Sequence, residues 1–209
     1  MKTIIFSLII LLFSIVIHEV SHGVMADHLG DPTARYAGRL SLNPIRHLDP
    51  FGSIILPLIT YFLFGFPIGA AKPVPINPYN FRNPKYDGVK VALAGPGANL
   101  FIALFFGLLI RFFPALSALP GFYLMFSYIV TINLLLAIFN LLPVPPLDGS
   151  HVLFALLPRS MEKIKIFLRQ YWLFVLFFLI FSLQLIWPLI FKLLSWIFRL
   201  IVGVPAPFF

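Results

Sequence analysis

A five-residue run near the amino terminus, His18-Glu19-Val20-Ser21-His22, has the H-E-x-x-H pattern. On a helix, residues i and i+4 lie on one face, so both imidazoles can reach one metal ion while Glu19 is placed to take a proton from metal-bound water. Two histidines with a carboxylate are a common ligand set for catalytic zinc. A chain of this His and Glu content contains the pattern by chance about once in a thousand sequences. We therefore expect one Zn²⁺ per chain and hydrolytic chemistry.

The pattern leaves the third metal ligand open between two residues. His28 follows the first histidine at the spacing of the longer metzincin pattern, but that pattern needs a glycine where this chain has Met25. Without that turn, we expect His28 to lie at the end of the span, away from the metal.

The stronger candidate for third ligand is Asp148, the next-to-last residue of the run Asn140-Leu-Leu-Pro-Val-Pro-Pro-Leu-Asp148-Gly149. The prolines break a helix at a membrane boundary, which is tolerated only where protein or a water-filled cavity surrounds the backbone. We expect Gly149 to give the turn its freedom and Asp148 to join the histidines. The alternative is that Asp148 caps a helix over residues 150–157.

The composition places these residues in a membrane protein. The chain is 60% hydrophobic and 11% charged, with a mean hydropathy of +0.99, whereas soluble proteins are about a quarter charged. In a lipid-embedded chain, the net charge of +8 reports topology, so we expect no nucleic-acid partner. The absence of cysteine excludes disulfides, cysteine zinc sites and thiol catalysis.

The apolar stretches predict an all-α polytopic membrane protein. Its catalytic core has three helices (the first span over residues 3–26, then 91–113 and 115–142), and a C-terminal span follows in residues 171–191. We expect a single domain over 1–209, with the core at about 1–158 and a C-terminal membrane region at about 159–209. Beyond Pro188, basic residues recur at helical spacing, which favours an amphipathic interfacial segment.

Two kinds of non-spanning segment complete this expected fold. Residues 51–66 are too short to cross about 30 Å of hydrocarbon and contain Pro57, so they predict a re-entrant or interfacial segment. The closely spaced prolines of residues 71–81 favour extended chain, and with 39–43 they predict short extended loop strands. Either strand would be able to receive an unwound substrate as an added strand.

The metal site also constrains the topology. One metal can join the late part of the first span to Asp148 only if the first and third core spans run in the same direction, so residues 51–66 should not cross. The positive-inside rule favours the same arrangement. If residues 51–66 do not cross, eleven basic residues lie on one side of the membrane and two on the other; if they cross, the numbers are nine and four. The eleven are Arg35, Arg39, Arg46, Lys72, Arg82, Lys85, Lys90, Arg159, Lys163, Lys165 and Arg169. This places the site towards the cytoplasm and the N-terminus outside.

Together, HEVSH, the middle-span run AGPGAN (94–99) and NLLPVPPLDG (140–149) resemble the site-2 protease family of intramembrane zinc metalloproteases. The resemblance covers about residues 15–155, and the chain looks like a minimal form without PDZ or CBS modules. It implies that His18, His22 and Asp148 bind zinc and that Glu19 is the general base. Asn140 would face the substrate carbonyl or the active-site water, and Pro143, Pro145 and Asn99 are further candidates to support substrate or transition state. Ser150 departs from the second glycine usual in the family.

The function implied is hydrolysis of peptide bonds within or near transmembrane segments of membrane proteins, by a zinc metalloendopeptidase of regulated intramembrane proteolysis. The expected partners are the lipid bilayer and transmembrane protein substrates, and the expected location is the plasma membrane of a prokaryote. The alternative is a non-catalytic metal carrier or scaffold that uses the same ligands. A carrier would need ionisable groups staged across the bilayer, and the core spans offer only this cluster. His47 and His151 are candidates to support the metal ligands by hydrogen bonds, although loop or cap roles are the simpler interpretation.

Overall fold

The computed structural model describes residues 2–49, 55, 62, 72–113, 115, 119 and 121–207. This part of the chain is helical and contains no strand, which confirms the all-α prediction, whereas the short extended strands predicted at 39–43 and 71–81 do not form there. The elements are α1 (Lys2–His28), α2 (Thr33–Tyr36), η1 (Pro44–His47), η3 (Pro78–Asn80), α4 (Pro84–Phe112), α6 (Phe122–Asn140), α7 (Gly149–Leu156), η4 (Arg159–Met161), α8 (Glu162–Gln170) and α9 (Trp172–Val202).

Three of these helices are long and apolar enough to cross a membrane: Ile5–His28, Tyr86–Phe112 and Phe122–Asn140. They correspond to the three predicted core spans. Helix α4 begins earlier than predicted because Pro84 suits the first turn of a helix and Asp87 accepts a 2.8 Å hydrogen bond from the Asn83 amide. Helix α6 begins directly after Gly121 rather than at the predicted start of the span, residue 115.

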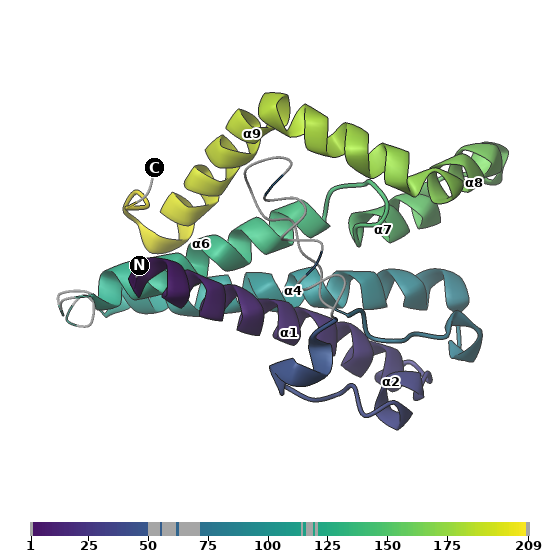
Figure 1. The fold of residues 1–209 in the computed structure, drawn as a ribbon, viewed down its shortest axis with the longest axis horizontal. Helices are drawn as coiled ribbons and strands as arrows, with labels where there is room; N and C mark the ends of the chain where they lie inside the picture. Colours follow the sequence, from purple (N-terminus) through teal and green to yellow (C-terminus); the bar gives the residue numbers. More distant parts are fainter. Residues whose placement is uncertain are drawn as a thin grey trace.

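Helices α1 and α6 run in the same direction, and α4 runs opposite to both (Figure 1). Two contacts establish this: Ser14 meets Asn133 halfway along the two helices, and His18 meets Asp148 beyond the end of α6. The parallel direction that a shared metal site requires is therefore confirmed. Residues 51–66, predicted to be re-entrant or interfacial, lie outside the described residues apart from 55 and 62.

Helix α9 is one continuous helix that bends near its middle, where Pro188 lies inside it (Figure 1). Its second half packs against α4 and α6 in the largest apolar core, where Leu134, Leu194 and Phe198 are buried. Arg111 of α4 donates a 2.7 Å hydrogen bond to the Leu200 carbonyl near the end of α9. The segment after Pro188, predicted to be an amphipathic interfacial segment, therefore continues α9 and packs its apolar face against the bundle.

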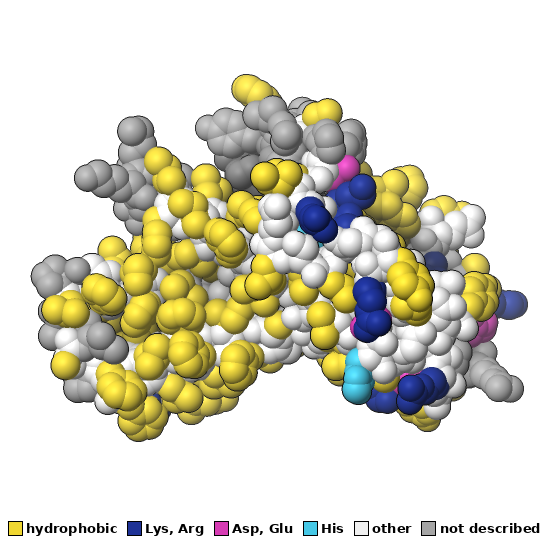
Figure 2. All heavy atoms as spheres, turned by 90° about the horizontal axis from the view of Figure 1, so that it is seen from below, with side chains coloured by type: hydrophobic (Ala, Val, Ile, Leu, Met, Phe, Trp, Pro, Cys, Tyr) yellow, Lys and Arg dark blue, Asp and Glu magenta, His cyan; other side chains and the backbone are white. Residues whose placement is uncertain are grey.

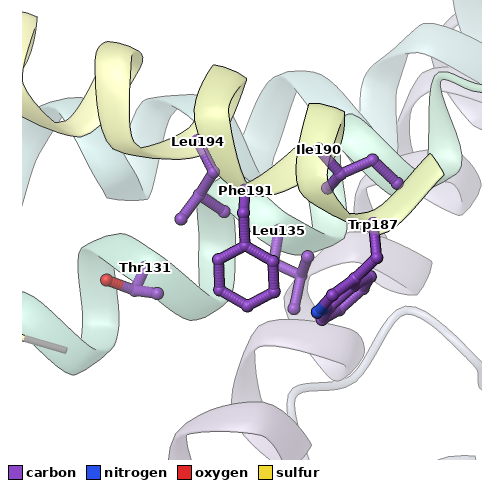
Figure 3. A pocket seen from close by; sticks show the side chains of 6 residues that line it. All are labelled: Thr131, Leu135, Trp187, Ile190, Phe191 and Leu194. Carbon is purple, nitrogen blue, oxygen red and sulfur yellow. The ribbon is translucent and has the colours of Figure 1, made fainter. Parts of the chain in front are cut away.

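A small apolar cavity of about 80 Å³ lies between α6 and α9 beside the bend (Figure 3). Trp187, Ile190 and Leu194 line it from α9, and Thr131 and Leu135 line it from α6. Its lining is hydrocarbon apart from the Thr131 hydroxyl and the Trp187 indole nitrogen. We assign it to imperfect packing at the bend.

The outer surface divides into an apolar part and a charged end. Figure 2 shows hydrophobic side chains over most of one face, while Lys and Arg side chains gather towards the end that holds α2. Exposed large side chains such as Leu8, Phe101 and Phe105 belong to this apolar surface. Such a belt, with charges at its end, is the surface of an integral membrane protein.

A buried carboxylate, that of Asp31, connects the segments at the charged end through hydrogen bonds. Asp31, which is 0% exposed, accepts hydrogen bonds from the Asn77 amide at 2.6 Å, from Asn80 Nδ2 at 2.8 Å and from the amide and hydroxyl of Thr33. Burial alone would raise the pKa of this carboxyl, but the hydrogen bonds outweigh burial and lower it. Asp31 thus anchors the segment that starts at Lys72 to the end of α1.

Candidate metal centre

Three ligand-type atoms from two parts of the chain converge at the core of the bundle. The Nε2 atoms of His18 and His22, one turn apart on α1, lie 3.1 Å from each other. Asp148 Oδ2, from the loop after α6, lies 3.1 Å from the first and 3.3 Å from the second. In the described part of the chain, these three side chains form a group with the geometry to hold a metal ion.

The hydrogen bonds of the two imidazoles determine which of their nitrogens carry a lone pair where the three atoms meet. The Val91 carbonyl can only accept, so His22 Nδ1 donates to it at 2.6 Å. His18 Nδ1 makes a 2.6 Å hydrogen bond with Asn99 Oδ1. In the neutral imidazoles both Nε2 atoms are therefore acceptors.

The third atom is also an acceptor. Asp148 Oδ2 is buried and has no hydrogen-bond donor among the residues that the structure describes. Three acceptors within 3.3 Å of one another repel unless a positive charge lies among them. Bonds of about 2.0–2.1 Å to a tetrahedral zinc would place neighbouring ligand atoms about 3.3–3.4 Å apart, close to the three separations observed. The residues therefore fit this metal.

Close packing of α4 holds the two imidazoles in place. At Gly95, in the AGPGAN run, a Cβ atom would lie 2.4 Å from His22 Nε2 and 2.6 Å from His18 Nε2. Only a residue without a side chain lets α4 approach the imidazoles this closely. The small residues of this run thus make room for the ligands.

Close packing also directs Asp148. The carboxylate makes no capping hydrogen bond to α7, so the alternative reading as a helix cap is not realised. A Cβ at Gly149 would lie 2.2 Å from the Leu141 carbonyl oxygen, and Gly149 is not among the glycines with positive φ. The prediction that Gly149 supplies turn freedom is therefore wrong: it supplies space against the end of α6.

Glu19 lies beside the cluster and is held by the segment that follows the undescribed stretch. Its Oε2 accepts a 3.0 Å hydrogen bond from the Val74 amide. Val74 lies between Pro73 and Pro75, which have no amide hydrogen. Arg39 fixes the same segment by donating to the Lys72 carbonyl at 2.6 Å. The proline-rich segment thus reaches the predicted base.

The other residues singled out in the sequence are distributed around this cluster. Asn140 donates a 3.0 Å hydrogen bond to the Leu136 carbonyl of its own helix. Pro143 is exposed and Pro145 is buried in the loop that leads to Asp148. Asn99 is 0% exposed and contacts His18.

None of the three remaining histidines belongs to the cluster. His28 is the last residue of α1, which continues straight through Met25 as the sequence predicted. His47 is buried and bonds the Ser41 carbonyl at 2.7 Å. His151 lies on α7 and lines a groove of about 200 Å³ with Glu162 and Arg169.

Sequence reasoning missed three contributors to the site: Asn133, Ser14 and the contact of Gly95. Asn133 is 0% exposed and Ser14 is 4% exposed, and both join Asn99 through hydrogen bonds. The available signal was the presence of these polar side chains within apolar spans, which is costly without partners.

Comparison with known proteins determines the family. The family model described as "Peptidase family M50" matches residues 115–183. A protein of Bacillus subtilis (strain 168) named "Putative zinc metalloprotease YwhC" is 38% identical over 208 residues, which cover 91% of each chain. The chain belongs to peptidase family M50. The predicted resemblance to site-2 proteases is confirmed.

Two further relatives carry similar names. "Putative zinc metalloprotease Rip2" of Mycolicibacterium smegmatis is 32% identical over 145 residues, 68% of this chain and 53% of the relative. "Putative zinc metalloprotease MJ0611" of Methanocaldococcus jannaschii is 38% identical over 103 residues, 49% of this chain and 51% of the relative. The chain spans about half the length of these two relatives. No solved structure matches it significantly.

Proposed function

We propose that this M50 member is an intramembrane zinc metalloendopeptidase that hydrolyses peptide bonds within or near transmembrane segments of membrane proteins. The observation that carries the proposal is the meeting of three acceptor atoms, from His18, His22 and Asp148, inside an apolar helix bundle. Polar groups at such a position are costly and are a functional site by default. The names of the relatives agree with this chemistry.

Each residue of the cluster has a role in this proposal. His18, His22 and Asp148 bind one Zn²⁺ per chain. When bound, zinc lowers the pKa of its water and polarises the scissile carbonyl. Glu19 takes the proton from the attacking water and later passes it to the leaving amine. Asn140, with Pro143 and Pro145 in the loop that leads to Asp148, supports the substrate carbonyl from the end of α6.

The substrate must lose its helical hydrogen bonds before a carbonyl can react. The segment around Val74 is a suitable place for the unwound stretch because Arg39 and Glu19 hold its backbone beside the cluster. We propose that the substrate adds here as an extended strand, through the main-chain groups of the segment that Glu19 and Arg39 do not already use.

The same proposal places the chain in the plasma membrane of a prokaryote as a single multi-pass domain, with the cluster towards the cytoplasm and the N-terminus outside. The gathering of Lys and Arg at the end that holds α2 supports this orientation (Figure 2). Basic residues are retained preferentially on the cytoplasmic side.

The experiment that tests this function is cleavage of a model transmembrane substrate by the purified full chain in detergent, with Glu19→Gln as the test variant. We expect Glu19→Gln to bind zinc as the wild type does and to lose turnover by at least about 10²-fold, because the proton acceptor is gone. Glu162→Gln is the matched control, since Glu162 is the other glutamate and lies exposed on α8. Wild-type protein that binds zinc but leaves the substrate intact would favour the non-catalytic alternative.

A further inference from the structure

We propose that Asn99, Asn133 and Ser14 form a polar chain whose function is to position the metal ligand His18 by fixing its orientation and its tautomer. These are positioning residues, and the inference rests on the proposed zinc site. In this proposal Asn99 supports the metal ligand His18 and does not contact the substrate.

The polar chain of Asn99, Asn133 and Ser14 connects all three core helices at one level of the bundle. His18 Nδ1 contacts Asn99 Oδ1 of α4 at 2.6 Å, and Asn99 Nδ2 donates to Asn133 Oδ1 of α6 at 2.8 Å. Asn133 Nδ2 donates to Ser14 Oγ at 2.9 Å, which returns the chain to α1 one turn before His18. Both asparagines are 0% exposed, so water does not replace these bonds.

Two backbone carbonyls fix the direction of every hydrogen bond in this chain. The carbonyl of Ile129 can only accept, so the Asn133 nitrogen must face it, at 2.9 Å. Asn133 therefore presents its oxygen to Asn99. The Ser14 carbonyl, 3.4 Å from Asn99 Nδ2, places the Asn99 nitrogen on the same side.

These bond directions determine which nitrogen of His18 carries the hydrogen. Since its nitrogen is turned to Asn133 and the Ser14 carbonyl, Asn99 presents its oxygen to His18, and His18 Nδ1 must donate. A neutral imidazole that donates from Nδ1 keeps the lone pair on Nε2, the atom that faces Asp148. The chain thus selects the tautomer that binds metal and holds the ring plane at the same time.

The two histidines are supported differently. His22 Nδ1 donates to a backbone carbonyl, that of Val91, which no substitution removes. His18 depends on a side chain. If the asparagines were only polar contacts between helices, any arrangement of donors and acceptors that satisfied them would serve, and the metal affinity would not depend on the acceptor that faces His18.

The test is the dissociation constant for zinc, measured by competition with a chelator on the purified full chain in detergent, for wild type, Asn99→Leu and Asn99→Asp. We expect Asn99→Leu, which removes the acceptor, to weaken zinc binding by about 10- to 100-fold. Asn99→Asp keeps an acceptor for His18 Nδ1 and should remain within about threefold of wild type. The visible spectrum of the Co²⁺-loaded protein should change for Asn99→Leu and not for Asn99→Asp.

Ser127→Ala is the control, because Ser127 is a 0% exposed polar residue on α6 whose hydroxyl has no hydrogen-bond partner in the described part of the protein. Should Asn99→Leu not fold, Asn133→Ala interrupts the polar chain one residue further from the metal and should weaken zinc binding by about tenfold, the lower end of the range expected for Asn99→Leu. Wild-type zinc affinity in Asn99→Leu or in a folded Asn133→Ala, or equal losses in Asn99→Leu and Asn99→Asp, would overturn the inference. Absence of zinc binding by the wild type would instead contradict the proposed function.

Discussion

Replacing Gly95 by alanine probes the metal centre without changing any ligand. The new Cβ would lie 2.4 Å from His22 Nε2 and 2.6 Å from His18 Nε2, whereas ordinary contact begins at 3.4 Å. The imidazoles or α4 must therefore move by about 1 Å, since 3.4 minus 2.4 is 1.0. Disturbing the surroundings that orient metal ligands costs up to about 10²-fold in metal affinity. We expect Gly95→Ala to weaken zinc binding by about this factor, which corresponds to about 2.8 kcal/mol.

Gly97→Ala is the matched control for this prediction, two residues along the same helix. A Cβ at Gly97 meets nothing within 4 Å. Both substitutions gain up to about 1 kcal/mol of helix propensity, so a loss confined to Gly95→Ala reports the contact with the histidines. The assay is zinc affinity by chelator competition, together with thermal unfolding of the metal-free protein. Equal zinc affinity in the two variants would refute the packing argument.

Three other predictions follow from the structure. Gly149→Ala should lower the thermal unfolding temperature and zinc content together, because its Cβ would lie 2.2 Å from the Leu141 carbonyl oxygen; wild-type values for both would contradict the close approach. Val74→Pro removes the amide that holds Glu19, so turnover should fall about tenfold with zinc content unchanged, and unchanged turnover would show that this bond is unimportant. Because the pKa of Asp31 is lowered from 3.8 on folding, its stabilising effect is fully present above pH 3.8 and is lost as the pH falls through the lower folded value. Asp31→Asn should therefore unfold at a lower temperature than the wild type at neutral pH, and its unfolding temperature should fall less steeply as the pH is lowered. Parallel curves of unfolding temperature against pH for variant and wild type would contradict this.

The ligands were predictable from the sequence because their chemistry is local. His18 and His22 need only one helical turn, and Asp148 follows a run of prolines that cannot continue a helix. The parallel course of α1 and α6 followed from requiring one metal to join these residues. Such arguments work because a rare ligand set admits few arrangements.

The remaining features depend on which helix faces meet, and the sequence does not state this. Asn133 and Ser14 are 119 residues apart and each resembles an isolated polar residue in an apolar span. Gly149 looks like a turn residue until the Leu141 carbonyl is seen against it. The second half of α9 carries basic residues at helical spacing, which is typical of an interfacial helix, yet Leu194 and Phe198 on its other face are buried in the bundle.

The most direct test of the central claim is the metal content of the purified full chain, wild type against Asp148→Ala, measured together with cleavage of a model transmembrane substrate. Asp27→Ala serves as the control, because Asp27 pairs with Arg35 outside the cluster. We predict one zinc per chain and cleavage for wild type and Asp27→Ala, and loss of both for Asp148→Ala, whose two histidines alone do not complete the site. Full zinc content in Asp148→Ala would contradict the assignment of the cluster as the metal centre.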